Sequence, residues 1–297
     1  MTNSNYRKNK GHLLCYTLSK KRTIGGKKVK EISLDGLLAF TALCEKYELR
    51  YYLSFGSLIG AVRHQGYIPW DDDIDLLMPR GDYERLRGLS DEFKTDEWEL
   101  LSYSAEPGFM LPFMKYCNRN TLILPSRFNT GFVYGISFDI FPLDFFDGSS
   151  AEEVKTNIIR MRDELIALER AAYITAVYKP GYTNRIKYFI KKTAFLMHPE
   201  KVKQVMEEYT RLDKMLTESS AKRGRYAAHV YSRYGTVWNT SDFVGSEDQY
   251  SQVLFEGHLF TAPYHVDDVL RATYGDYMQL PPLEERVCGH SYIACYR

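Results

Sequence analysis

The sequence predicts an α+β fold in which a mixed β-sheet core, flanked by helices, is interrupted by a helical insertion. Before residue 150, short aromatic and aliphatic segments typical of strands alternate with segments of helical periodicity. Between residues 150 and 220 only helical patterns occur, and strand patterns return after residue 225. The 297 residues, 44% hydrophobic and 26% charged, are enough to bury a sizeable core.

The first part of the chain alternates between helices and strands. Apolar residues at helical spacing predict an amphipathic helix over 31–48. The aromatic segment 50–55 predicts a strand that turns directly into a short helix. A second strand is expected over 73–78, before a helix over 82–89. Further strands are expected at 98–103, 113–118 and 136–141.

Helical signals dominate the middle of the chain. Ser150 and Glu153 have the spacing of a capping box, which predicts a helix extending to about residue 178. Pro180-Gly181 would end it, and Pro199 suits the first position of a later helix. The remaining predicted elements are helices over 184–197, 199–220 and 266–274, a strand over 227–232 and a hairpin over 253–261.

This order of elements divides the chain into four parts. Residues 1–30 hold nine Lys and Arg and no Asp or Glu, which indicates a basic N-terminal segment. Residues 31–149 would form the core, 150–224 the helical insertion, and 225–297 a C-terminal segment that completes the core. Two separate domains are the alternative.

Charge and cysteine content exclude several classes of protein. With 39 Lys and Arg against 38 Asp and Glu, the net charge of +1 provides no overall attraction to nucleic acid. The five cysteines include no CxxC pair, which argues against a disulfide framework and favours a reducing cytoplasm. Cys288 and His290 lack the spacing and further ligands of a zinc site. No apolar run approaches the roughly 18 residues of a membrane span, and no signal-peptide pattern occurs. We therefore expect a cytoplasmic protein.

Acidic residues on two predicted strands indicate a metal site. Asp73 and Asp75 lie two apart in a strand and therefore project from one face. Asp139 has the same relation to its own strand, between Ser137 and Phe141. Carboxylates held side by side repel one another unless a cation neutralises them, so we expect Mg²⁺ or Mn²⁺ here. Such a triad can serve a phosphoryl displacement, with a carboxylate as base.

Gly56-Ser57 lies between a predicted strand and a predicted helix. A glycine there lets backbone N–H groups approach a phosphate at the helix N-terminus. The combination of Gly-Ser, then Asp-x-Asp on a strand, then a separate strand aspartate is the pattern of the nucleotidyltransferase-like fold. A solvated acidic turn after Trp70 is the alternative.

The longest motif, residues 55–75, is Phe-Gly-Ser-Leu-Ile-Gly-Ala-Val-Arg-His-Gln-Gly-Tyr-Ile-Pro-Trp-Asp-Asp-Asp-Ile-Asp. Shorter motifs follow at 78–83, 138–144, 255–263 and 274–282, with Arg286 and His290 after the last. Together they resemble the signature of the LicD family of phosphocholine transferases, which is related to the fukutin-related proteins. The resemblance extends from about Leu53 to His290 and leaves the helical block and the first 30 residues unmatched.

The resemblance implies an enzyme that transfers phosphocholine from CDP-choline to a sugar of a teichoic acid, lipopolysaccharide or glycolipid precursor, releasing CMP. Fukutin-related proteins use another CDP-activated alcohol, so transfer of phosphoethanolamine, glycerol phosphate or ribitol phosphate is an alternative. A nucleotidyltransferase that uses an NTP and releases pyrophosphate is another. A non-enzymatic choline-binding module is disfavoured, because binding a cation does not need a carboxylate triad.

The resemblance also implies roles for individual residues. Gly56 and Ser57 would hold phosphate, and His290 would contact phosphate or transfer a proton, unless it is merely hydrogen-bonded. Glu256 and Arg286 are possible substrate contacts, with a turn carboxylate as the alternative for Glu256. The metal ligands and the base would come from Asp71, Asp73, Asp75 and Asp139, of which Asp71 could instead orient the others. Arg63, Arg80 and Lys115 would neutralise the pyrophosphate, or are surface cations.

Two further expectations concern the ligands. A trimethylammonium group favours an aromatic cage, for which Tyr67, Trp70 and Tyr134 are candidates among 24 tyrosines and other aromatic residues. The predicted helix 184–197 separates an apolar face from its basic residues. Together with the basic segment 1–30, it predicts peripheral association with an anionic membrane, and a core-packing helix is the alternative.

Overall fold

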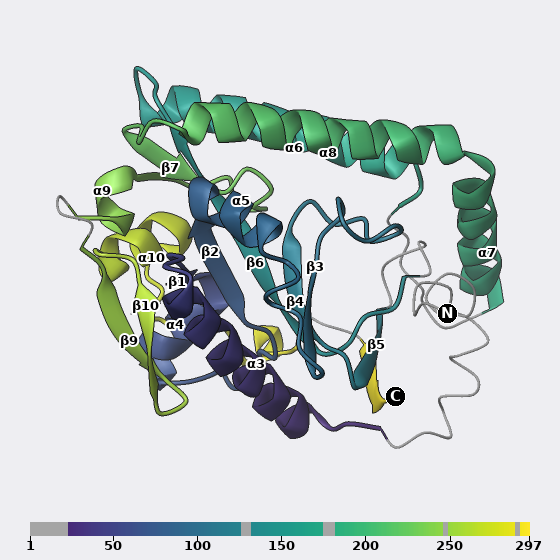
Figure 1. The fold of residues 1–297 in the computed structure, drawn as a ribbon, viewed down its shortest axis with the longest axis horizontal. Coiled ribbons are helices and arrows are strands. Elements are labelled where there is room, and N and C mark those ends of the chain that lie inside the picture. The colour runs from purple at the N-terminus through teal and green to yellow at the C-terminus, as the bar shows by residue number, and fades with distance from the viewer. Residues whose placement is uncertain (1–22, 126–131, 175–181, 246–248, 289–291) are drawn as a thin grey trace.

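A computed structural model, shown in Figure 1, describes residues 23–125, 132–174, 182–245, 249–288 and 292–297. Its centre is a seven-stranded sheet of order β1-β2-β6-β4-β3, with β7 pairing β6 and β8 pairing β7. β2 and β6 are parallel, and the other pairs of this sheet are antiparallel, so the predicted mixed α+β architecture is confirmed. The strands are β1 (Tyr52–Leu53), β2 (Asp75–Pro79), β3 (Trp98–Leu101), β4 (Met114–Asn118), β6 (Ser137–Phe146), β7 (Tyr226–Ala228) and β8 (Val237–Asn239).

Strand β6 connects the parts of the sheet. Its first half lies between β2 and β4, and its second half pairs with β7. Phe138 and Ile140 are buried beneath α3 (Gly26–Lys46), where the ring of Phe40 meets that of Phe138 edge-on at 5.4 Å between centroids. Asp139 lies between these two buried residues and therefore projects from the opposite face.

A second apolar core covers the face of the sheet from which Asp139 projects. It includes Leu77 of β2 and Leu143 of β6, together with Leu58 and Leu270 from two helices. Its other residues come from elements that pack against this face of the sheet. Those elements are α4 (Phe55–His64), α9 (Thr240–Phe243), α10 (Val266–Tyr274) and the hairpin of β9 (Ser251–Phe255) and β10 (His258–Ala262).

The helical insertion consists of α6 (Ala151–Ala171), α7 (Tyr182–Met197) and α8 (Pro199–Ser220). Helices α6 and α8 lie side by side along one side of the molecule, and α7 lies at their far end, apart from the sheet (Figure 1). The predicted cap is confirmed, because Ser150 Oγ accepts a hydrogen bond from the Glu153 N–H at 3.2 Å. The division into four parts stays a prediction.

Several element boundaries differ from those predicted. Strand β1 has two residues, because Phe55 takes a φ of +47° and turns the chain into α4. The strand predicted over 227–232 ends at Ala228, where a turn begins in which the Ser232 N–H donates to the His229 carbonyl at 3.1 Å. A pairing of β5 (Thr121–Pro125) with β11 (Tyr292–Tyr296) was not predicted at all. Pro180-Gly181 lies outside the described residues.

Further boundary shifts occur in and just before the first half of the predicted core. Helix α3 begins at Gly26, within the segment predicted as a basic N-terminal region, of which residues 1–22 lie outside the described part of the chain. Strand β2 begins at Asp75 and α5 (Arg80–Gly88) follows Pro79 directly. In the described part of the chain, no helix has the length and apolar character needed to cross a membrane.

Candidate active site

Three neighbouring strands place three charged residues in one row. The parallel register of β2 and β6 puts Asp75 opposite Asp139, and the antiparallel register of β6 and β4 puts Lys115 on the other side of Asp139. Residues opposite one another on adjacent strands project from the same face. Lys115 Nζ forms an ion pair with Asp139 Oδ1, and both side chains are partly accessible to solvent. The sheet thus brings together three of the residues predicted from the sequence.

Asp75 lies at the centre of a concentration of negative charge. Desolvation by its surroundings raises the pKa of its carboxyl above the ordinary value, and the charges of Asp73, Asp139 and Asp71 raise it further. Lys115 acts in the opposite direction but does not compensate for them. The four predicted aspartates are therefore near enough to interact electrostatically, as the metal-site prediction required.

The turn from β1 into α4 holds these carboxylates in place. Ser57 Oγ accepts a hydrogen bond from the Asp75 N–H at 2.9 Å, and the Ser54 N–H donates to the Asp75 carbonyl at 3.0 Å. A Cβ atom on Gly56 would lie 2.6 Å from Asp71 Oδ2. Gly56 therefore leaves space for the Asp71 carboxylate, while Ser57 fastens the helix to the start of β2. Phosphate binding by these two residues stays a prediction.

A basic and aromatic patch lies where α4 meets the C-terminal segment. The Arg286 guanidinium lies over the Trp70 ring, 5.6 Å from its centroid. Arg63 donates to the Tyr277 carbonyl at 2.6 Å. Desolvation and the neighbouring charge of Arg286 lower the pKa of Arg63. Three predicted site residues thus gather in one patch that includes Trp70, the residue before Asp71, and two of them supply positive charge.

Lys115 is surrounded by aromatic rings as well as by Asp139. Its Nζ lies 5.4 Å from the centroid of the Tyr134 ring and 5.6 Å from that of Phe113. Burial alone would lower the pKa of Lys115, but Asp139 and Tyr134 raise it above the ordinary value. The lysine therefore stays charged at neutral pH and available to an anion.

Tyr67 and Glu256 are held by contacts with each other and with neighbouring residues of the protein. The Tyr67 ring packs on Phe255 at 4.9 Å, and its hydroxyl donates to the Lys30 carbonyl at 3.0 Å. Glu256 Oε1 accepts from the Tyr67 N–H at 3.0 Å, and the Glu256 N–H donates to the Gln65 carbonyl at 2.9 Å. Glu256 is thus engaged as a turn carboxylate, the alternative weighed for it from the sequence.

Arg80 is corrected by the structure. Its guanidinium is fully buried and donates to both oxygens of Asp144 at 2.6 and 3.1 Å, and to Asp213 at 3.0 Å. It also contacts Glu84. Burial acts to lower the pKa of Arg80, but Asp144 and Asp213 raise it. Because carboxylates of the protein already satisfy this cation away from solvent, it is not placed to neutralise a pyrophosphate.

Sequence reasoning missed a band of aromatic rings beside the carboxylates. The rings follow one another in contact, with centroids 4.6, 5.8, 6.2 and 5.0 Å apart, and none is fully buried. In order they are Phe113, Phe141, Phe55, Tyr234 and Tyr274. Burial, Tyr234 and Asp75 all raise the pKa of Tyr274, which places its hydroxyl within electrostatic reach of Asp75.

The signals for this band were uneven. Tyr274 begins one of the motifs quoted above and could have been selected from it. Tyr234 and its neighbour Arg233, whose guanidinium lies over the Tyr234 ring at 4.8 Å, follow β7 in a loop without a motif. Only the tertiary fold brings that loop to Asp75. His290, in contrast, lies outside the described residues.

The donor set is chemically suited to a hard divalent cation, because it consists of carboxylates that repel one another. Within the described residues, however, no three His, Cys, Asp or Glu side chains converge closely enough to hold a metal ion. The Asp139 carboxylate is paired with Lys115 instead. A separate cavity of about 520 Å³, between α3, β1 and the β9–β10 hairpin, is lined by none of the predicted site residues.

Fold and site together define a class of protein. A mixed sheet with carboxylates on two adjacent parallel strands, beside a Gly-Ser turn at a helix N-terminus, is the arrangement of a nucleotidyltransferase-like transferase. Residues 48–151 match the family described as LicD/FKTN/FKRP, nucleotidyltransferase domain. This match includes all four aspartates.

Similarity to individual proteins extends beyond that domain. The chain is 28% identical over 269 residues to the lipopolysaccharide cholinephosphotransferase LicD of Haemophilus influenzae, which covers 87% of this chain and 93% of the relative. A stretch of 58 residues is 47% identical to the human ribitol 5-phosphate transferase FKRP, covering 17% of this chain and 12% of FKRP. An uncharacterized protein, RP689 of Rickettsia prowazekii, is 41% identical over 76 residues, 25% of this chain and 28% of its own. Residues 48–151 of this chain are thus a nucleotidyltransferase domain of the LicD/FKTN/FKRP type.

Proposed function

We propose that the protein transfers phosphocholine from CDP-choline to a sugar hydroxyl of a cell-surface glycan precursor, a teichoic acid, lipopolysaccharide or glycolipid, and releases CMP. The observation that most supports this is the row of Asp75, Asp139 and Lys115 across β2, β6 and β4. It occurs in a chain that aligns with 93% of a lipopolysaccharide cholinephosphotransferase.

The proposed reaction is a displacement at phosphorus. The acceptor hydroxyl oxygen forms a bond to the phosphorus that bears choline, and the bond from that phosphorus to the CMP oxygen breaks with its electron pair. A carboxylate of the row, Asp139 or Asp75, takes the proton of the hydroxyl. Lys115 lies beside Asp139 and would stabilise the negative charge on the transferring phosphoryl group, with Arg63 and Arg286 placed toward the departing CMP.

We further propose that the reaction depends on Mg²⁺ or Mn²⁺, held by Asp73 and Asp75 with Asp71 and Asp139 as additional ligands. The support is chemical: the carboxyl pKa of Asp75 is raised by three neighbouring carboxylates, and a divalent cation would relieve that repulsion. When bound, such a metal offsets negative charge on phosphate oxygens. Binding at all four would require Asp139 to exchange Lys115 for the metal.

The aromatic band supports choline as the transferred alcohol. A quaternary ammonium group cannot donate hydrogen bonds, and it is attracted to the faces of aromatic rings and to nearby negative charge. Phe55, Tyr234 and Tyr274 offer such rings next to Asp75. We assign the choline site to this band in preference to Tyr67, whose ring is packed against Phe255.

Ribitol phosphate is the second candidate for the transferred group, because FKRP, named as a ribitol 5-phosphate transferase, shares a stretch of this chain. A ribitol site would be expected to present hydrogen-bonding groups to the hydroxyls of the polyol. The partly exposed rings of Phe113, Phe141 and Phe55 have no such groups. Glycerol phosphate, phosphoethanolamine and an NTP remain to be separated by experiment.

We place the reaction in the cytoplasm. Cys44 and Cys117 are free thiols in the core, as expected in a reducing compartment. Burial strongly raises the pKa of the Cys44 and Cys117 thiols, which suits inert core residues.

The test is a comparison of ligand-induced shifts in the thermal unfolding midpoint. Purified protein is measured with Mg²⁺ and, in turn, CDP-choline, CDP-ethanolamine, CDP-glycerol, CDP-ribitol, CTP and free choline. We expect a Mg²⁺-dependent rise with CDP-choline, reduced by Asp73→Asn. Tyr234→Ala should weaken CDP-choline but not CMP, whereas Tyr250→Ala, at an exposed tyrosine away from the band, should change neither.

Other outcomes would redirect the proposal. A rise with CDP-ribitol alone would replace choline by ribitol, and a rise with CTP alone would indicate a nucleotidyltransferase. A response to free choline without any nucleotide would indicate a binding module. Equal responses with and without EDTA would contradict the metal dependence.

A further inference from the structure

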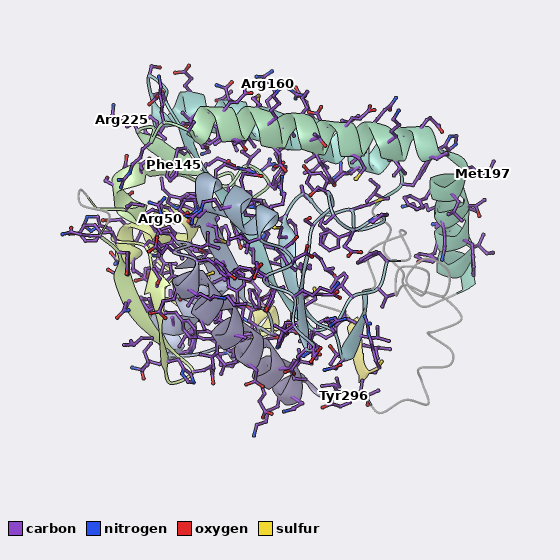
Figure 2. The ribbon with its side chains drawn as sticks, viewed as in Figure 1. Arg50, Phe145, Arg160, Met197, Arg225 and Tyr296 are labelled. Carbon is purple, nitrogen blue, oxygen red and sulfur yellow. The ribbon has the colours of Figure 1, made fainter. Side chains whose placement is uncertain are left out.

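Helix α7 exposes more apolar surface than its position in the fold requires. It lies at the end of the α6 and α8 pair, apart from the sheet (Figure 1), and Met197 lies at the outer edge of the molecule (Figure 2). The side chains of residues 186–197 are described, and five large apolar ones among them are 45 to 69% exposed. They are Ile186, Phe189, Ile190, Leu196 and Met197.

These exposed side chains form one stripe. At 3.6 residues per turn, the five positions fall within an arc of about 120° around the helix axis. Tyr188 and Phe195 lie on the opposite side, and Phe195 is buried in the apolar core that α6 and α8 share. The helix is therefore attached by one face and presents the opposite, apolar face outward. Packing into the core, the alternative for α7, explains the attached face but not the exposed apolar face.

Basic residues flank the exposed stripe. On the same helical projection, Lys187 lies beside one border of the apolar arc and Lys192 lies beside the other, whereas Lys191 lies farther round, toward the side of Phe195. The sequence of α7 contains no Asp or Glu. Desolvation lowers the pKa of Lys192, because its stem lies against the protein, whereas Lys187 and Lys191 are exposed. Lysines at the borders of an apolar stripe match a surface with apolar chains below and negative charge above.

We propose that α7 docks onto an anionic lipid bilayer, with the apolar stripe inserted at the level of the acyl chains and Lys187 and Lys192 at the headgroups. A second copy of this chain fits less well, because stripe-to-stripe contact would bring the lysines of both copies together without a carboxylate on either helix. A lipid surface with negative headgroups supplies apolar chains for the stripe and negative charge for the lysines.

The test is flotation of the full-length protein with vesicles. We compare neutral phosphatidylcholine vesicles with vesicles containing 30 mol% phosphatidylglycerol, an amount on the order used for anionic membranes. Binding is expected only to the anionic vesicles, and it should fall with added salt because headgroup contacts are screened. Replacing both Lys187 and Lys192 by Gln should weaken it on the order of tenfold or more, since each lysine contributes about 1 kcal/mol near such a surface.

The matched variants are Ile190→Glu and Leu259→Glu. Both side chains are 63% exposed, but Leu259 lies on β10, far along the chain and outside the stripe. Ile190→Glu should abolish flotation and Leu259→Glu should not. Neither should change the thermal shift with CDP-alcohols, so this inference can fail independently of the proposed function.

Three results would count against docking onto a bilayer. Flotation that Leu259→Glu lowers as much as Ile190→Glu does, or binding to neutral and anionic vesicles alike, would overturn the proposal. A monomer-to-dimer shift by light scattering that Ile190→Glu abolishes, without flotation, would replace the bilayer by a second copy.

Discussion

Strand β6 holds two aspartates five residues apart, and the difference between them separates function from structure. Asp139 pairs with Lys115 and remains partly accessible, next to three further carboxylates. Asp144 is fully buried, and its two oxygens accept from Nε and Nη2 of Arg80. Both lie in the same motif, 138–144. The comparison shows that a strand aspartate with a basic partner is not by itself a catalytic signal.

Charge balance distinguishes the two environments. Around Asp144, the cations Arg80 and Arg87 bind Asp213 and Glu84 as well, so each charged group has a partner of opposite sign. Around Asp139, negative groups outnumber the nearby lysine. An accessible cluster in which carboxylates far outnumber the cations can accept a cationic ligand, whereas a buried one in which every charged group is paired can only support the fold.

Asp139→Asn should have the largest effect on turnover. It removes a carboxylate from the row while keeping its shape, and we expect the rate of CMP release to fall by about 10³-fold or more. The free energy of unfolding should change much less, because repulsion with Asp75 is relieved as the pair with Lys115 is lost. Turnover and urea unfolding of the same preparation check this. Activity within tenfold of the parent protein would remove Asp139 from the chemistry.

Asp144→Ala should show the opposite pattern. It leaves a buried guanidinium without its bidentate partner, and breaking such a pair costs about 3–5 kcal/mol of stability. Urea unfolding measures the loss, and the remaining folded fraction should still bind CDP-choline. If Asp144→Ala is as stable as the parent protein but inactive, the assignment of the two aspartates is reversed.

Much of this fold could be predicted from sequence because local patterns determine it. Pro199 and the capping residue Ser150 set helix starts that the structure reproduces at α8 and α6. Strand alternation predicted that Asp139 projects from one face of a strand neighbouring that of Asp75, and the pairing of β2 with β6 confirms this, although their parallel direction was not predicted. Arg80 was assigned to the site because only its local motif was considered. The contact that helps to bury its guanidinium comes from Asp213 of α8, which is distant in the sequence.

The rest depended on contacts between distant segments. The loop with Arg233 and Tyr234 reaches Asp75 only because β7 pairs with the second half of β6. The short β11 has no pattern that identifies β5 as its partner. The sequence predicted an apolar face on α7 that included Phe195, but the structure buries Phe195 on the attached face and leaves the other apolar residues of that face exposed.

His229 contacts the segment of β6 between Asp139 and Asp144 and makes the stability of the fold depend on pH. Its ring packs against Phe141, its Nδ1–H donates to the Pro142 carbonyl at 3.0 Å, and burial lowers its pKa to about 3, despite that hydrogen bond. In the unfolded chain this histidine binds a proton near pH 6.5, whereas in the folded protein it stays neutral at that pH. Its contribution to the free energy of unfolding is therefore fully present above pH 6.5 and is lost as the pH falls toward 3. From pH 7 to 5 we expect a loss of about 2 kcal/mol from this residue.

His229→Gln keeps a donor for Pro142 and removes the titration. Urea unfolding at pH 7 and 5 should therefore show a smaller pH-dependent loss in the variant than in the parent protein. Equal slopes would mean that His229 is protonated in the folded state and that this part of β6 is open to water.

The smallest effect is expected from one methyl group at the rim of the site. The φ of Gly56 lies outside the left-handed region, so the residue is needed for space, and an added Cβ would meet Asp71 Oδ2 at 2.6 Å. Gly56→Ala should displace that carboxylate and lower turnover by roughly tenfold, at a stability cost of about 1 kcal/mol or less. Gly81→Ala, where nothing lies within 4 Å, is the control and should raise helix stability by roughly 0.5–1 kcal/mol with turnover unchanged. Because both changes add the same group near a helix start, equal turnover in the two variants would show that Asp71 does not need its present position.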